Sequence, residues 1–161
     1  MHIRYIKILF ALCASGMALF YAAHNVANIN AAHGAFVYVM SGVGHEAYPE
    51  TMFFKTTSPA LAWIACTVVI LLEVVAGLLL LKGSFDMFSN VSSNSEAFNN
   101  SKKLAEIGAG IGVVVWFGFF GVIGAAFFQM WQTEVGANSM NGAFQYFISM
   151  AVTLLFINKA D

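Results

Sequence analysis

The chain has 161 residues, of which 60% are hydrophobic and only 9% are charged, whereas a soluble domain carries about 25% charged residues. A water-exposed surface cannot be built from this composition, so a soluble globular domain is excluded. The formal net charge is −1 and the seven basic residues are scattered, which excludes the basic stripe of a nucleic-acid-binding protein.

Four apolar runs approach the length of about 20 residues that crosses about 30 Å of hydrocarbon. They cover residues 5–23, 59–81, 104–130 and 142–157. The first run is long for the core of a signal peptide, so we expect it to be an uncleaved first span. The sequence therefore predicts an all-α fold, a four-helix transmembrane bundle that forms one integral membrane domain over residues 1–161.

The first connection, residues 24–58, is long for a loop without structure of its own. Its apolar stretches predict one or two short helices, which would make it a partly helical outer (periplasmic) loop. It also contains His24, His33 and His45. These are candidate ligands for copper, zinc or a haem. However, no two of them have the i, i+3 or i, i+4 spacing of a helical ligand pair, and a polar cap over the bundle is the interpretation that we favour.

The second span contains an acidic residue, Glu73, nine residues before Lys82 and fourteen after Pro59. A carboxyl group at that depth is costly unless it is paired, protonated or hydrated. One hypothesis is a functional role as a proton relay, a counter-ion or a hydrogen-bond partner of a quinone or pigment. The other is a hydrogen bond to a neighbouring helix, which the small residues nearby, such as Cys66 and Gly77, favour.

The third span is rich in glycine and begins near a basic pair. We expect Glu106, at its start, to pair with Lys102 four residues earlier. Small residues let helix backbones approach closely in a membrane, so the glycines predict two smooth faces and two neighbouring helices. The alternative is that they make room for a flat cofactor or a lipid tail, and packing is the interpretation that we favour. The predicted helix-packing residues are Gly108, Gly110, Gly112, Gly121 and Gly124.

Two spans carry stripes that are natural partners for Glu73. The fourth span has a polar stripe of Gln145, Ser149 and Thr153, and the first span has a stripe of small residues, Ala11, Ser15, Ala18 and Ala22. Amphipathic aromatic rings prefer the membrane interface. We therefore expect Trp63, Trp131 and Tyr146 to be interfacial anchors at the outer surface.

Basic residues resist translocation and therefore mark the cytoplasmic side. Six of the seven fall at the N-terminus, between the second and third spans, or in the tail, and only Lys55 falls on the opposite side. The sequence predicts a multi-pass membrane protein with both termini in the cytoplasm.

A set of short motifs resembles the bacterial family of predicted small integral membrane proteins, a domain of unknown function, over nearly the whole chain. In chain order the motifs are Arg4-Tyr5-Ile6-Lys7-Ile8, Thr57-Ser58-Pro59-Ala60-Leu61, Glu73, Lys102-Lys103-Leu104-Ala105, Gly108, Trp116-Phe117, Met130-Trp131-Gln132 and Gly142-Ala143-Phe144. The resemblance implies a bacterial inner membrane and the topology above. It brings no activity, cofactor or partner.

The sequence lacks several enzyme signatures, namely HExxH, Gly-x-Ser-x-Gly, a phosphate loop and CxxC. We expect a non-catalytic accessory or assembly subunit of a larger membrane complex, of respiratory or light-harvesting type. One alternative is a small oligomeric channel or transporter with Glu73 on the path, and another is a redox subunit that binds haem or metal. The expected partners are lipids and either a larger complex or further copies of the chain, with no cofactor.

Overall fold

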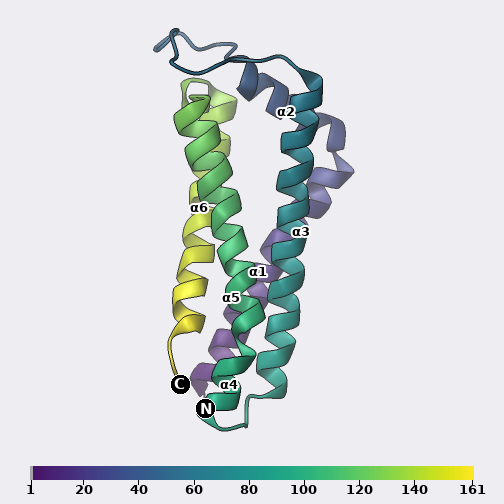
Figure 1. Cartoon of the computed structure of the whole chain (residues 1–161), viewed down its shortest axis with the longest axis vertical. Helices are drawn as coiled ribbons and strands as arrows, with labels where there is room; N and C mark the ends of the chain where they lie inside the picture. The colour runs from purple at the N-terminus through teal and green to yellow at the C-terminus, as the bar shows by residue number, and fades with distance from the viewer. Residues whose placement is uncertain (1) are drawn as a thin grey trace.

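The computed structural model describes residues 2–161, and this part of the chain folds into helices, with one long connection at residues 42–58 and short connections elsewhere. Four of the helices are long and apolar enough to cross a membrane: His2–Ala27, Pro59–Ser89, Ser95–Phe127 and Glu134–Asn158. Figure 1 shows them side by side along the long axis, with both chain ends together. The predicted all-α bundle is confirmed. We call the end with the termini the terminal end, and the end with residues 42–58 and 128–133 the loop end.

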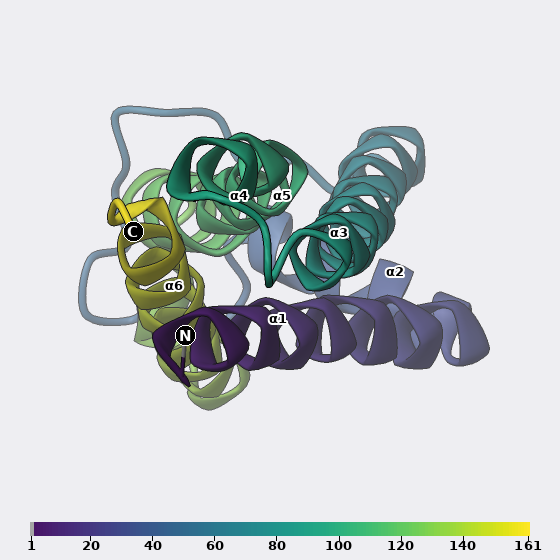
Figure 2. The same ribbon diagram turned by 90° about the horizontal axis from the view of Figure 1, so that it is seen from below.

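The first long helix, α1 (His2–Ala27), is followed almost directly by α2 (Ile29–Ser41). Figure 2 shows α1 extended across the view from below, so it is inclined to the bundle axis. A short helix was expected in this connection, and α2 is that helix. It ends at Gly42, whose positive φ of 69° is the left-handed conformation that glycine adopts easily.

The helix α3 (Pro59–Ser89) begins with a good local signal, because the Ser58 side chain accepts a hydrogen bond from the Leu61 amide and Pro59 fits the first turn. It ends eight residues later than the predicted boundary at 81. The additional turns mix charged and polar residues with Phe85, Met87 and Phe88, and an ion pair between Lys82 and Asp86 lies on their exposed side. Hydropathy locates the apolar run but not this mixed end.

The third long helix is built from three pieces: α4 (Ser95–Ser101), α5 (Lys103–Val113) and η1 (Val114–Phe127). The last is a π-helix, in which hydrogen bonds run from residue i to i+5, a form that rarely exceeds one turn. It ends at Phe127, and two residues later Gln129 has a positive φ of 53°. A short 3-10 turn, η2 (Met130–Gln132), then leads to the last helix.

The last helix, α6 (Glu134–Asn158), begins eight residues before the predicted boundary at 142. The Thr133 side chain caps it by accepting a hydrogen bond from the Gly136 amide at 3.1 Å. Two asparagines in the first turns, Asn138 and Asn141, interrupt the apolar run and hide this start from hydropathy.

The four long helices pack in a ring, in which α1 and α5 each contact both α3 and α6. At the terminal end α3 and α5 are very close. A Cβ atom added at Gly108 would lie 2.7 Å from the Ala76 carbonyl oxygen, and one at Gly83 would clash with the Ala105 backbone. Toward the loop end α3 and η1 separate (Figure 1).

Candidate functional site

The buried acid Glu73 joins two helices. Its side chain is 2% exposed, and Oε2 accepts a hydrogen bond of 3.0 Å from Nδ2 of Asn25 on α1. One turn further along α3, the Ser15 hydroxyl donates to the Gly77 carbonyl at 2.8 Å. Two polar contacts therefore fix α1 against α3 inside the apolar bundle, where hydrogen bonds between helices are stabilising.

Of the two stripes predicted to neighbour Glu73, the one on α1 packs against α3, where Ser15 bonds the Gly77 carbonyl. The one on α6 does not reach Glu73, and that part of the prediction is wrong. Gln145 and Ser149 are exposed, and Thr153 is buried away from Glu73. The physical reason is the order of helices around the ring, because α6 contacts α1 and α5 whereas Glu73 on α3 faces α1.

Two residues of the predicted polar stripe, Gln145 and Ser149, belong instead to a stripe on the exposed side of α6. Asn138, Asn141, Gln145 and Ser149 follow one another at helical spacing, and all four are exposed. Gln145 lies eleven residues after Glu134 and thirteen before Asn158, which places it about 16–20 Å from either helix end. Within residues 2–161, no side chain hydrogen-bonds its carboxamide. The helix centre thus presents a free amide to the surroundings.

A groove of about 610 Å³ runs beside this stripe, between α1 and α6. Ser149 and Val152 belong both to the stripe side of α6 and to the groove. The α1 wall includes Phe10, Met17 and the free, exposed thiol of Cys13. We call the stripe and this groove together the α6 face.

The glycines of the third helix divide into two groups. Gly108 lies against α3, and an added Cβ at Gly112 would lie 2.9 Å from Met150 on α6. Gly124 lies against Met130. In contrast, Gly110 has nothing within 4 Å and Gly121 meets only residues of its own helix. Gly110 belongs to the regular helix α5 at a position that no other helix approaches, whereas Gly121 belongs to the π-helix η1, whose rotation per residue differs from the α-helical value behind the prediction.

Two close helix contacts involve glycines of α3, of which Gly77 was expected at a helix interface beside Glu73 and Gly83 was not expected. Gly77 on α3 meets Leu19 of α1, and Gly83 meets Ala105 of α5. Gly77 and Gly83 are six residues apart and follow no small-xxx-small pattern, so their role depends on which helices become neighbours.

The three predicted interfacial anchors lie in different surroundings. Trp63, near the start of α3, stacks on His33 with ring centroids 4.2 Å apart. Trp131 lies in the loop-end turn, edge-on to Tyr48 at 5.5 Å. Tyr146 is twelve residues into α6 and packs on Tyr21 and Trp116. It is therefore not at a helix end, because α6 begins earlier than predicted.

The three outer histidines do not form a metal-ligand cluster of three or more His, Cys, Asp or Glu side chains within residues 2–161. His24 is exposed, and Nε2 of His33 lies 3.1 Å from the Pro59 carbonyl oxygen. His45 is 9% exposed, and burial, followed by the nearby charge of Lys55, lowers its pKa below the ordinary value. Its ring is thereby favoured in the neutral form.

A buried ionic cluster closes the terminal end, and the sequence reasoning missed it. The Asp161 carboxylate lies 2.7 Å from the Lys7 ammonium group and 2.5 Å from that of Lys102. The three side chains are only 4%, 2% and 1% exposed, respectively. We call them the terminal clamp. The prediction that Lys102 pairs with Glu106 is therefore wrong. Glu106 instead accepts a hydrogen bond from the Asn158 side chain.

The charges around Asp161 set its ionisation. Burial alone would raise the pKa of this carboxyl group, but the hydrogen bonds and charges of Lys102 and Lys7 outweigh burial and hold the pKa below its ordinary value. The only sequence signal for the clamp is the presence of basic residues beside apolar runs, and that signal does not identify the partner.

Comparison with known proteins settles the family. Residues 3–160 match the family described as predicted small integral membrane protein (DUF2165). The chain belongs to this family. The resemblance seen in the sequence motifs is thereby confirmed, and with four apolar helices the protein is an integral, multi-pass membrane protein. No curated protein and no solved structure matches the chain.

Proposed function

We propose that this protein is a non-catalytic accessory subunit, which associates through its α6 face with a transmembrane helix of a larger complex in the bacterial inner membrane. The observation that carries the proposal is the exposed carboxamide of Gln145 at the centre of α6. A lipid chain offers such a group neither a donor nor an acceptor, so leaving it in hydrocarbon is unfavourable. A partner helix with a polar side chain at the same depth would satisfy it.

The surroundings of Gln145 suit a helix rather than a single polar group. Ser149 extends the polar stripe by one turn, and the adjacent groove gives room for side chains of the incoming helix. The glycines of α5 lie mainly against α3 and against the inner side of α6, so they are already used inside the bundle. We therefore assign the partner to the outward-facing α6 face.

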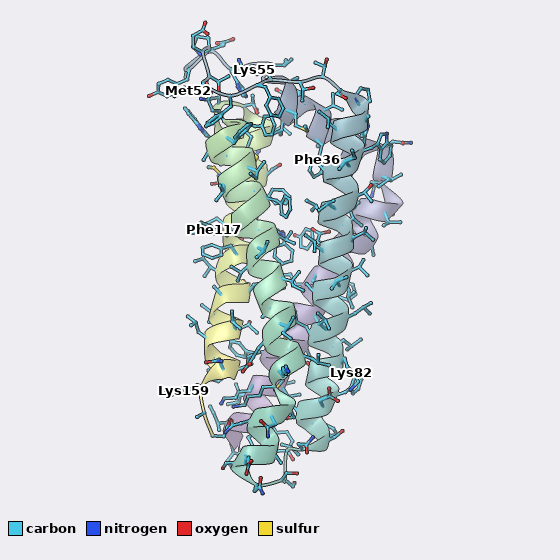
Figure 3. All side chains as sticks on the ribbon, viewed as in Figure 1. Phe36, Met52, Lys55, Lys82, Phe117 and Lys159 are labelled. Carbon is cyan, nitrogen blue, oxygen red and sulfur yellow. The ribbon has the colours of Figure 1, made fainter. Side chains whose placement is uncertain are left out.

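The distribution of charge supports the proposed orientation. Figure 3 shows Lys82 and Lys159 toward the terminal end and Lys55 at the loop end. The other four basic residues also belong to helices or turns at the terminal end, namely Arg4, Lys7, Lys102 and Lys103. Since basic residues resist translocation, we place the terminal end in the cytoplasm and the loop end in the periplasm.

The proposal is tested by exchanging Gln145 for leucine. The wild-type protein is extracted from its own membrane into polymer-bounded discs and weighed by native mass spectrometry, which should give a heteromeric assembly of fixed stoichiometry. An interhelical hydrogen bond contributes about 0.6–1.4 kcal/mol, so Gln145→Leu should weaken recovery of the partner by about 3- to 10-fold. Phe144→Leu, a neighbouring exposed position, is the matched control and should leave recovery unchanged.

A photo-crosslinking residue at position 152 should capture the same partner, whereas one at Leu71, exposed on α3, should not. If recovery of the partner were unchanged in both Gln145→Leu and Phe144→Leu, or if position 152 captured no partner, the α6 face would be ruled out as the contact surface. A pure homo-oligomer whose contact depends on Gln145 would favour the channel or transporter hypothesis instead. A bound haem or metal in the extracted complex would favour the redox hypothesis.

A further inference from the structure

An apolar cavity lies at the loop end of the bundle, between α3, η1 and α2. Its volume is about 360 Å³, within the range of sites that bind small molecules. Every residue that lines it is apolar except Ser139. Figure 3 shows Phe36 in the space between the two long helices at this end.

The space exists because two helices separate. Near the terminal end Gly108 holds α5 against the backbone of α3, so no room is left between them. Beyond Val114 the chain continues as the π-helix η1, and it diverges from α3. π-Helical segments are frequently found at functional sites, and here Phe119, Phe120 and Ile123 of η1 form one wall of the cavity.

The cavity is closed toward the water at the loop end. Phe53 stacks on Phe127 at 4.2 Å, and Phe54 meets Phe127 and Phe128 edge-on at 5.5 and 5.8 Å. These four rings tie the loop to the end of η1 and cover this end of the space, which Phe54 and Phe128 also line. A water-borne ligand would have to displace them.

The cavity is open toward the membrane. On α3 its rim includes Ile64 and Val68, which are 61% and 38% exposed, and on η1 it includes Ile123, which is 43% exposed. Its floor is buried, with Val69 and Met130 at 2% and 3% exposure. The path from lipid to floor is apolar throughout, and water does not fill such a space stably.

From this geometry we propose that the cavity is a binding site for an acyl chain of a membrane phospholipid, which enters between α3 and η1 and leaves its head group at the interface. The lining offers one hydroxyl, that of Ser139, and no charged group. It therefore recognises a hydrocarbon chain rather than a polar ring, and this favours a phospholipid over a quinone.

The test fills the cavity and asks what happens to retained lipid. Ala65, which is half-buried in the lining, is replaced by phenylalanine, and Ala126, which is exposed on η1 outside the lining, receives the same change as a matched control. After detergent exchange, native mass spectrometry should find phospholipid on the wild type and on Ala126→Phe, and at least tenfold less on Ala65→Phe. Equal retention in the two variants would overturn the proposal.

A second measurement needs no substitution. The wild-type protein is reconstituted with a phospholipid carrying a photoreactive group near the end of its acyl chain, and the labelled peptides are mapped. Labelling should concentrate on Val68, Val69, Phe119 and Phe120 relative to Leu155, which is 74% exposed on α6. Uniform labelling of all lipid-facing positions would overturn the proposal. Preferential retention of an added polyprenyl quinone over phospholipid would equally contradict it.

Discussion

At the scale of single residues, the most informative feature is the hydrogen bond between Glu73 and Asn25. Glu73 lies inside an apolar bundle, and within residues 2–161 it has no basic side chain as partner. The hydrogen bond therefore stabilises the fold by satisfying the Asn25 donor and the Glu73 acceptor. A buried polar group left without its partner costs about 1–3 kcal/mol.

Substitutions at Glu73 separate a hydrogen-bonding role from an acidic one. Glu73→Gln keeps an acceptor for Asn25 and should unfold within a few degrees of the wild type. Glu73→Leu should lower the thermal midpoint clearly, because the Asn25 amide loses its acceptor. Circular dichroism in detergent measures both. If Gln were as destabilising as Leu, the carboxyl group itself would be required, and the channel or transporter hypothesis would gain support.

The depth of Glu73 could be predicted from its distance to Pro59 and Lys82, but its partner could not. Asn25 lies near the end of α1, and it reaches Glu73 because α1 packs on α3. The hydrophobic run of α1 does not predict how this helix is inclined. The same limit applies to Gln145, because its residue type is visible in the sequence whereas its exposure depends on the order of helices in the ring.

At the scale of elements, glycine spacing was informative only where the helix is regular and a neighbour is near. Gly108 and Gly112 lie in α5, an α-helix, and both contact another helix. Gly121 lies in η1, where the rotation per residue differs from that of an α-helix, so the predicted packing face does not continue there. A long π-helix leaves no recognised sequence signal, so this part of the fold could not have been predicted.

Gly108 and Gly110 form a matched pair for testing that account. At Gly108 an added methyl group meets the α3 backbone, and overpacking of this kind costs about 1–3 kcal/mol. At Gly110 the methyl group has free space, and alanine is the better helix former by about 1 kcal/mol. Gly108→Ala should therefore lower the midpoint of unfolding in detergent, and Gly110→Ala should leave it unchanged or raise it. Equal effects would mean that the α3–α5 contact is loose.

At the scale of the whole molecule, the four spans could be predicted because each apolar run is long enough for a bilayer. The terminal clamp could not, since it joins residues from three distant parts of the chain. Lys7 and Lys102 are withdrawn from water around one carboxylate. Removing one partner of a buried ion pair typically costs about 3–5 kcal/mol, because the other charge is left uncompensated.

Asp161→Asn should therefore destabilise the bundle strongly, and Asp86→Asn is its control. Asp86 pairs with Lys82, whose side chain is 62% exposed, and an exposed pair of this kind contributes at most about 1 kcal/mol. Thermal unfolding in detergent measures the difference. Similar midpoints for the two variants would show that the clamp is not stabilising.

The clamp also gives a pH dependence with a definite sign. Because the pKa of Asp161 is lower in the folded protein than its ordinary value, its contribution is complete at pH values above that ordinary value. The contribution is lost as the pH falls through the lower, folded value. Asp161→Asn should therefore lose most of its difference from the wild type in strong acid.

The clamp has a consequence for the order of events during synthesis. Lys7 and Lys102 leave the ribosome 154 and 59 residues ahead of the carboxylate that neutralises them. Until Asp161 is made, both lysines stay charged and without this partner, which is the state in which basic residues hold a nascent helix end on its own side of the membrane. In the orientation that we propose, with the terminal end in the cytoplasm, the same two charges would first orient the spans during insertion and only afterwards seal the finished bundle.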